Sequence, residues 1–391
     1  MDSTASRTGA GGGLKMGEKK QIDLSLERLS GVGPSTAKKW REKGYKDIRA
    51  IANASSQQLV RDLDINITKA QSLIAEANRL LADETIVFLS ASKILEKVKE
   101  RRQYISTGCK WLDVILGGGV PTDASTLITG EYGTGKTQLC MQLAVNCVVD
   151  LKRVVVYLAT ETASYSPERI VAMAVFGRNY VPKGWNPDKL AEVLNRVSYG
   201  LYKINPDQAE KYIINANGTI DFDKDIFIVE PQYLQTSEKI YKALQGVETD
   251  LIEARGLDVG LVIIDSYTGV MRSEFLGRGS LDERSAEWSR HIRLINRLTS
   301  RYNLAVVGTG QMYGIPDPML QGKIGARRTG VKAVPWGGVG FLHSWTYMIS
   351  LEQVQGGKKQ DALYEAFLFD TPTPKQTAQF IITKEGIRDA Y

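Results

Sequence analysis

The stretch GEYGTGKTQ, residues 130–138 of this 391-residue sequence, has the form G-x-x-x-x-G-K-[ST]. It follows the strand-like run STLIT and precedes a helical run, which is the setting that a phosphate-binding loop requires. Its backbone amides would hold a β-phosphate, Lys136 would reach the β- and γ-phosphates, and the Thr137 hydroxyl would bind Mg²⁺. The residues predicted to bind the nucleotide are Gly130, Glu131, Tyr132, Gly133, Thr134, Gly135, Lys136, Thr137 and Gln138.

Strands and helices alternate in the sequence from about Gly108 onward. Strand-like runs include STLITG, RVVVYLAT, IFIVEP, VGLVIIDS, NLAVVGTG and TYMISL, and helical runs lie between several of them. This pattern predicts an α/β domain with a mostly parallel central sheet covered by helices. Residues 183–225, approximately, carry turn-forming residues without a clean period. We interpret them as an insertion of loops and short helices.

Three of these strands end on side chains that suit ATP hydrolysis. LVIID ends on Asp265, the form of a Walker B strand whose carboxylate holds Mg²⁺. VVVYLATE ends on Glu161, which would act as the general base, and NLAVVGTGQ ends on Gln311, which would sense the γ-phosphate. The predicted catalytic residues are therefore Glu161, Lys136 and Gln311. The alternatives at this point are an aspartate that caps a helix and a glutamate that holds a loop.

Two basic segments follow these strand ends. After Asp265, arginines recur every six residues at Arg272, Arg278 and Arg284. A longer segment after Gln311 contains glycine, proline and more basic residues, and such cationic loops suit the phosphate oxygens of DNA. A solvated surface loop of ordinary composition is the alternative. The basic residues of the longer segment are Lys323, Arg327, Arg328 and Lys332.

The N-terminal third has a different character. Residues 1–21 are polar and glycine-rich, which predicts a disordered tail. Residues 22–83 contain LSGVGPSTAKKW, the pattern of a helix-hairpin-helix domain whose glycine turn can approach a DNA phosphate. A small protein-binding domain with a basic face is the alternative. Residues 84–106 are interpreted as a linker whose apolar start could add to the sheet edge of a neighbour.

Composition narrows the class of protein. The net charge is +6 and hydrophobic residues make up 43% of the chain, which permits a nucleic-acid partner in a soluble protein. We expect no membrane segment and no secretion signal, and hence a cytoplasmic location. The cysteines Cys109, Cys140 and Cys147 form no C-x-x-C pair, so neither a zinc site nor a redox motif is indicated.

These motifs together resemble the archaeal RadA recombinases, a group that includes the eukaryotic strand-exchange recombinases and, more distantly, bacterial RecA. The resemblance covers most of the chain and is carried by LSGVGPSTAKK, STGCKWLDVILGGGV, GEYGTGKTQ, SPERI, RSEFLGRGSLDER and FDTPTPKQTAQFIITKEGIRD. It implies a RecA-like P-loop ATPase core over residues 107–391, preceded by the small all-α helix-hairpin-helix domain. The cofactors that it implies are ATP and Mg²⁺.

The resemblance also assigns roles to individual residues. Phe88 and Ala91, in FLSA, are similar to the F-x-x-A polymerisation motif, in which the phenylalanine fills a pocket of the next protomer. Arg272, Arg278 and Arg284 fall in the first DNA-binding loop, and residues from Met312 to about Val334 resemble the second. Three further positions match residues that lie near the adenine, cap the neighbour's ATP and relay the nucleotide state. They are, in that order, Arg169, Asp370 and His343.

The function implied is a DNA-dependent ATPase that forms helical filaments on single-stranded DNA, pairs it with homologous duplex and exchanges strands in DNA repair. Its partners would be single- and double-stranded DNA, further copies of itself and recombination mediators. It would act at the nucleoid, or in the nucleus of a eukaryote. The sequence departs from the family at Gly310, where T-G-Q replaces T-N-Q. The alternatives are a regulatory paralogue without strand exchange, a hexameric helicase-type ATPase and a non-catalytic DNA-binding scaffold.

Overall fold

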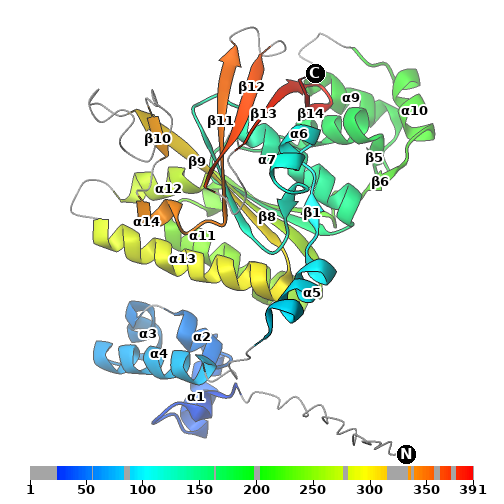
Figure 1. The fold of residues 1–391 in the computed structure, drawn as a ribbon. Helices are drawn as coiled ribbons and strands as arrows, with labels where there is room; N and C mark the ends of the chain where they lie inside the picture. The colour runs from blue at the N-terminus through cyan, green and yellow to red at the C-terminus, as the bar shows by residue number, and fades with distance from the viewer. Residues whose placement is uncertain are drawn as a thin grey trace, which may run out of the picture. The chain divides into compact units, whose positions relative to one another are not determined.

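The computed structural model describes residues 24–54, 56–82, 89–162, 164–197, 203–275, 281–314, 333–335, 339–355, 362–370 and 376–390. The chain divides into two compact units, Met1–Ile94 and Leu95–Tyr391 (Figure 1). Each unit is considered separately below. Within the part of the chain that the structure describes, no helix combines the length and the apolar character that a membrane span needs.

The first unit is all-α. Its elements are η1 (Leu26–Arg28), α1 (Pro34–Glu42), α2 (Ile48–Asn53), α3 (Ser56–Leu63) and α4 (Ile67–Ala82). Leu26, Trp40, Ile48 and Leu73 are buried in one core, so helices that are too short to be stable alone pack on one another. The turn between η1 and α1 needs Gly31, whose φ is +78°.

The second unit is built on a ten-stranded sheet with the order β14-β13-β12-β11-β3-β9-β8-β4-β7, to which β10 (Ala333–Pro335) adds by pairing with β9. The strands β11, β3, β9, β8, β4 and β7 run parallel to one another, whereas the pairs β11–β12, β12–β13 and β13–β14 are antiparallel. The strand bounds are β3 (Ser125–Gly130), β4 (Val154–Ala159), β7 (Ile226–Val229), β8 (Val259–Asp265), β9 (Ala305–Gly314), β11 (Tyr347–Gln355), β12 (Leu363–Asp370), β13 (Thr377–Thr383) and β14 (Gly386–Asp389).

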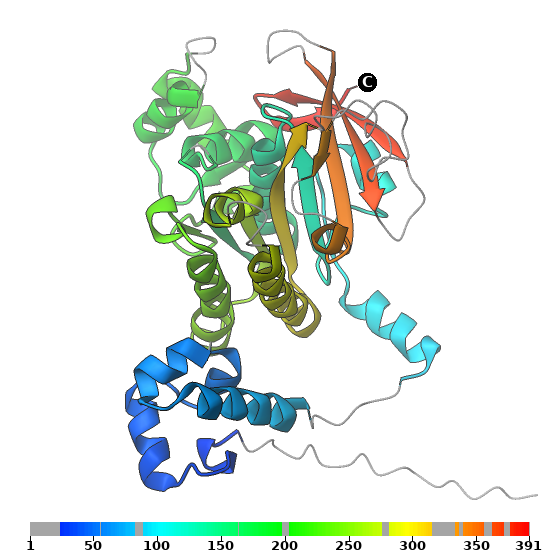
Figure 2. The same cartoon turned by 90° about the vertical axis from the view of Figure 1, so that its left-hand side faces the viewer.

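Helices cover both faces of this sheet (Figures 1 and 2). Along β4, Val155 and Tyr157 point into one core and Val156 and Leu158 into the other, as the two-residue period of a strand requires. The first core includes α6 (Lys110–Ile115), α7 (Lys136–Asn146), η2 (Cys147–Leu151), α8 (Pro167–Ala172) and η3 (Met173–Gly177). The second includes α11 (Ser237–Gly246), η5 (Val247–Ala254), α12 (Tyr267–Glu274), α13 (Leu281–Tyr302) and α14 (Val339–Leu342). The α/β class predicted from the alternating runs is confirmed.

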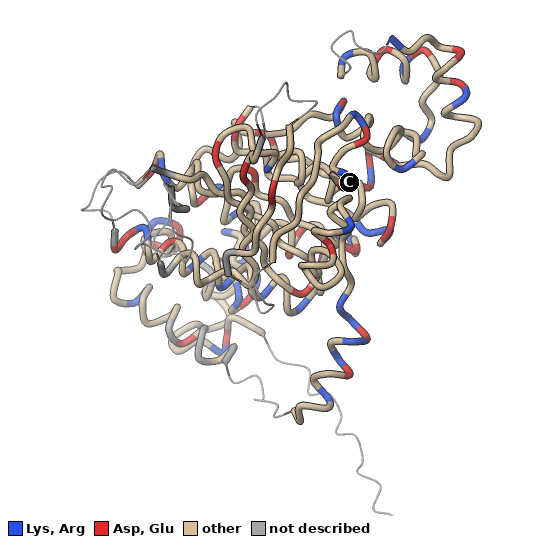
Figure 3. The backbone as a smooth tube through the Cα atoms, turned by 45° about the horizontal axis from the view of Figure 1, so that its top comes forward, with Lys and Arg blue, Asp and Glu red and all other residues tan. Residues whose placement is uncertain are grey.

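The segment expected to be a linker is partly structured. It contains α5 (Ala91–Arg101), in which no residue is buried and both acidic and basic residues occur. Figure 3 marks the acidic and basic residues along the described chain. It also contains β1 (Tyr104–Ile105), which pairs with β2 (Val120–Pro121). Strand β1 is therefore paired with the strand that follows α6.

The expected insertion is more regular than its turn-forming residues suggested. It contains α9 (Pro187–Val197), α10 (Pro206–Ile214) and β6 (Gly218–Ile220), and β6 pairs with β5 (Tyr180–Pro182), which directly precedes the insertion. Leu190, Leu194 and Ala209 are fully buried in a small separate core, and this burial supports helices in a stretch without a long apolar run. The short η4 (Pro231–Tyr233) follows β7.

Strand β9 is also longer than the sequence pattern predicts. The sequence pattern ended it at Gln311, but β9 continues to Gly314. Its last three residues pair antiparallel with Ala333–Pro335. The first and last residues of the predicted second DNA loop, Met312 and Val334, therefore lie in paired strands.

Candidate nucleotide and DNA site

The phosphate-binding loop joins β3 to α7. Gly130 has φ +157°, and a Cβ there would lie 2.5 Å from the carbonyl oxygen of Leu351, so only glycine fits. Gly135, with φ +92°, precedes α7, whose first turn has no side-chain cap. The backbone amides of that first turn therefore point at a cradle suited to phosphate.

Lys136 lies over the loop. Its Nζ donates to the carbonyl oxygens of Gly130 and Glu131, each at 2.8 Å. Burial lowers the pKa of Lys136, and the nearby carboxylates of Asp265 and Glu161 act in the opposite direction. The two carbonyl oxygens are uncharged, so negatively charged phosphate oxygens would form stronger hydrogen bonds with the Lys136 ammonium.

Asp265 is the buried centre of the site. It ends β8 with 3% of its surface exposed, and three hydroxyls donate to its carboxylate. The donors are Thr137 Oγ1 at 2.8 Å, Thr309 Oγ1 at 2.5 Å and Tyr157 Oη at 3.1 Å. Burial raises the pKa of Asp265, and the three hydroxyl bonds oppose that rise. Of these three donors, the sequence predicts only Thr137 as a site residue.

The donor set fits Mg²⁺ bound together with a nucleotide. Among the residues that the structure describes, no group of three or more His, Cys, Asp or Glu side chains could hold a metal ion. Thr137 and Asp265 therefore offer a hydroxyl and one carboxylate. Mg²⁺ commonly takes its remaining ligands from water and substrate phosphates in such sites.

Two further hydrogen bonds form a path that connects Glu161, Gln311 and Arg272. Gln311 Nε2 donates to Glu161 Oε1 at 3.3 Å, and Arg272 Nη1 donates to Gln311 Oε1 at 3.2 Å. The backbone N–H of Gln311 donates to Thr268 Oγ1 at 2.9 Å, which ties the strand end to α12. The path therefore connects a carboxylate after β4 with the first arginine of the predicted DNA loop.

Arg169 lies beside the phosphate loop, at the start of α8. Its Nε donates to Gln138 Oε1 at 2.8 Å. Its two terminal nitrogens donate to the carbonyl oxygens of Lys384 at 2.8 Å and Thr383 at 2.5 Å. The guanidinium thus joins the turn between β13 and β14 to the first turn of α7.

Comparison with known proteins agrees with this geometry. The Rad51 family model matches residues 99–220 and 208–390, two stretches that overlap within the insertion. The chain belongs to the Rad51 family. A model described as a SAM-like helix-hairpin-helix tandem matches residues 23–79. The DNA repair and recombination protein RadA of Methanococcus maripaludis is 30% identical over 391 residues, covering 93% of this chain and 99% of that protein.

Membership of the Rad51 family confirms the RadA-type resemblance and the RecA-like fold expected from the sequence. It does not test the individual site residues. Several of the predicted site residues lie outside the described residues, so their positions stay predictions. They are Phe88, Arg278, Lys323, Arg327, Arg328 and Lys332.

Other predicted residues are only partly placed. Ala91 is the exposed first residue of α5, and Asp370 is the last residue of β12, paired with Met348. Arg284 lies on α13, with its guanidinium 5.4 Å from the Trp288 ring. His343 is exposed in the turn between α14 and β11.

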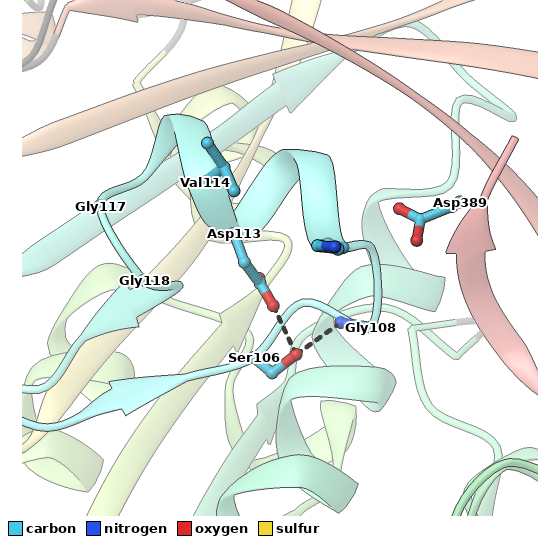
Figure 4. A pocket seen from close by; sticks show the side chains of 8 residues that line it. Ser106, Gly108, Asp113, Val114, Gly117, Gly118 and Asp389 are labelled. Carbon is cyan, nitrogen blue, oxygen red and sulfur yellow. Dashed lines mark hydrogen bonds between the residues drawn. The ribbon is translucent and has the colours of Figure 1, made fainter. Parts of the chain in front are cut away.

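A separate cavity of about 570 Å³ lies beside α6 (Figure 4). Within it, Ser106 Oγ donates to Asp113 Oδ2 at 2.6 Å and accepts from the Gly108 N–H at 3.1 Å. Burial raises the pKa of Asp113, and its hydrogen bonds from Ser106 and Thr107 oppose the rise. The cavity includes no residue of the phosphate loop or of the three strand ends, so it is not the nucleotide site.

Proposed function

We propose that this Rad51-family protein is a DNA-dependent ATPase that forms helical filaments on single-stranded DNA and catalyses homologous pairing and strand exchange in DNA repair. The observation that carries the proposal is the path from Glu161 through Gln311 to Arg272. It connects the candidate hydrolytic base with a residue suited to DNA phosphate. The printed name of the Methanococcus relative, a DNA repair and recombination protein, supports the same assignment.

In this proposal the chain's own groups bind and orient ATP. Lys136 would exchange its two carbonyl acceptors for phosphate oxygens, and Thr137 with Asp265 would hold Mg²⁺. A bound Mg²⁺ would offset negative charge on the phosphates. Glu161 would accept the proton of the attacking water. Arg169, beside Gln138, would form part of the adenine side.

Gln311 would report the nucleotide state. A γ-phosphate that competes for its amide would weaken the bond to Glu161 and move the acceptor of Arg272. The first loop would then change its contact with DNA. The second loop would add further backbone contacts, so binding would depend on salt and little on sequence. His343 would link the second loop to the core.

Self-association would place ATP between protomers. Phe88 and Ala91 would dock on the next copy, and β7, on whose outer side no strand of the described residues pairs, offers an edge for an added strand. Asp370 would cap the neighbour's ATP. A heterologous contact of this kind builds an open helix. Double-stranded DNA and recombination mediators would be further partners, and the protein would act at the nucleoid or in a nucleus.

The first test is ATP turnover with and without single-stranded DNA. Glu161→Gln should lower kcat by roughly 10²- to 10⁴-fold, the usual contribution of a general base, while ATP binding persists. Glu168→Gln is a matched control, because Glu168 accepts from Ser166 Oγ and lies outside the proposed base site. Undiminished turnover in Glu161→Gln would refute the assigned base.

A regulatory paralogue is the second candidate, and Gly310 favours it. A Cβ at this position would lie 3.3 Å from Thr129 Cγ2 and 3.4 Å from Thr268 Cγ2, so the strand end has little room for the family's asparagine. A strand-exchange assay separates the candidates, since the paralogue would bind ATP and DNA without producing exchanged strands.

A further inference from the structure

A cluster of four buried aromatic side chains lies where the two predicted DNA-binding loops join the ATPase core. Trp288 lies on α13, one turn after Arg284 of the first loop, and Phe341 lies on α14, the first helix after the second loop. Tyr267 begins α12, and Trp345 precedes β11. At most 5% of each of the four aromatic residues is exposed. The cluster therefore brings together segments that follow both loops.

The rings of Trp288 and Phe341 make the closest contact in this cluster. Their centroids are 3.9 Å apart and their planes lie at 37°, so α14 packs against α13 (Figure 1). The Arg284 guanidinium lies 5.4 Å from the centre of the Trp288 ring, within the range of a cation–π contact. A predicted DNA-binding arginine of the first loop is thus connected through one ring to the helix after the second loop.

Tyr267 connects the cluster to the candidate Mg²⁺ site. It follows Asp265 by two positions, and its fully buried ring stacks on Phe341, with centroids 5.9 Å apart and planes at 20°. Side chains in a close-packed core leave no free space around one another, so one ring moves only if its neighbours move. A shift of the chain at Asp265 would therefore displace Phe341.

Trp345 connects the same cluster to β9. Its ring meets those of Tyr267 and Phe341 edge to face, with centroids 5.7 and 6.0 Å apart. A Cβ at Gly308 would lie 2.6 Å from Trp345 Cη2, so β9 can approach this ring only through a residue without a side chain. Thr309, the next residue of β9, donates to the buried aspartate at the end of β8. Two neighbours of that aspartate thus contact the cluster.

We propose that Trp288 and Phe341 are positioning residues that make the two DNA-binding loops respond together when the nucleotide changes. The inference rests on the ATP-dependent DNA binding in the proposed function. The path through Gln311 reaches Arg272, whereas the aromatic cluster reaches Arg284 and the helix after the second loop. Packed interfaces have discrete arrangements, so a small shift at the nucleotide site would reposition both loops at once.

The test measures how strongly the affinity of the full-length protein for single-stranded DNA depends on the nucleotide. Binding of a dT oligonucleotide is followed by fluorescence anisotropy, with Mg²⁺ and either a non-hydrolysable ATP analogue or ADP. The variants are Trp288→Leu, Phe341→Leu and the double variant. Leu298→Ala is the matched control, because Leu298 is fully buried on the same helix and in the same core, about three turns beyond Trp288.

We expect each leucine variant to lower the ratio of the two affinities at least about fivefold, the lower end of a typical allosteric coupling. The double variant should lose no more than the weaker single variant, because both substitutions break one contact. Trp288→Phe should retain the ratio, since an aromatic ring still faces Arg284 and Phe341. An unchanged ratio in both leucine variants, additive losses in the double variant or an equal loss in Leu298→Ala would overturn the inference.

A spectroscopic measurement serves if a leucine substitution prevents folding. The fluorescence of the wild type minus that of Trp288→Phe gives the emission of Trp288. This emission should change when DNA binds, because a phosphate would draw the Arg284 guanidinium from the indole ring. An emission that DNA leaves unaltered would also overturn the inference. Failure of strand exchange by the wild type would refute the proposed function alone, since neither measurement depends on it.

Discussion

At the scale of single residues, the site depends on how one buried carboxylate is solvated. Asp265 receives three hydroxyl hydrogen bonds in place of water, from Thr137, Thr309 and Tyr157. Burial nevertheless raises its pKa, so the folded protein retains this proton to higher pH than the unfolded chain does. Its contribution to stability is therefore present at low pH and is lost as pH rises through the folded-state pKa.

Thr309→Val tests this balance. Removing one donor should raise the pKa of Asp265 further, because the charged form loses a hydrogen bond. Mg²⁺ binding needs the carboxylate, so the acid limb of the pH profile of kcat/KM should move to higher pH. Thr129→Val is the control, since Thr129 Oγ1 donates to the Ile349 carbonyl and does not contact Asp265. Identical acid limbs in Thr309→Val and the wild type would contradict the expectation.

Gln311→Ala tests the coupling path at the same scale. The substitution deletes the bonds to both Glu161 and Arg272 but leaves the phosphate loop intact. We expect DNA-independent turnover to change by only a few-fold and stimulation by single-stranded DNA to be lost. Turnover is measured across a series of DNA concentrations. A variant that retains full stimulation would show that the signal travels by another route.

At the scale of secondary-structure elements, glycine positions determine which strands can meet. Gly119 precedes β2, and a Cβ there would lie 2.5 Å from the carbonyl oxygen of Ile105 in β1. Its φ of +124° adds strain for any other residue. Gly117 also has a positive φ, of +79°, but no atom lies within 4 Å of its Cβ position. A substitution at Gly117 therefore strains only the backbone conformation, whereas a substitution at Gly119 also creates a steric clash.

Gly119→Ala should lower the free energy of unfolding by about 3 kcal/mol, because left-handed strain and a backbone clash act together. Gly117→Ala should cost about 1 to 2 kcal/mol, from conformation alone. Urea unfolding of both variants measures the difference. Equal losses would mean that the pairing of β1 with β2 is not tightly packed.

At the scale of the whole molecule, the proposed activity requires more than one copy. Among the described residues the sheet ends at β7, and none of the residues of α5 is buried. Leu95 on that helix is 61% exposed, and Ile94 is 49% exposed. An open sheet edge and an uncovered amphipathic helix are both features that a neighbouring protomer could cover.

Phe88→Glu tests self-association. A charge in place of the proposed docking phenylalanine should leave the protein monomeric, abolish filaments on single-stranded DNA and remove DNA-stimulated turnover, while ATP still binds. Light scattering and electron microscopy measure the outcome. Leu89→Glu is the matched control, because Leu89 is the adjacent exposed apolar residue at 41%. Filaments of normal length from Phe88→Glu would exclude this contact.

Local sequence pattern was enough to predict the α/β class, the motif that joins β3 to α7 and the end of β8 at Asp265. A loop motif and a strand period are encoded by adjacent residues, so they can be recognised before any folding. The pattern predicted short helices in the insertion but did not locate them, because α9 and α10 are stabilised by a few buried side chains among turn-forming residues.

The rest depended on which strands become neighbours. Thr309 and Tyr157 reach Asp265 because β9 and β4 flank β8, and this order differs from the order along the chain. The hydrogen bonds from Arg169 on α8 to the turn between β13 and β14 likewise join segments far apart in sequence. No local period encodes such contacts, because they arise only when the burial of one face of each element fixes its position against the others.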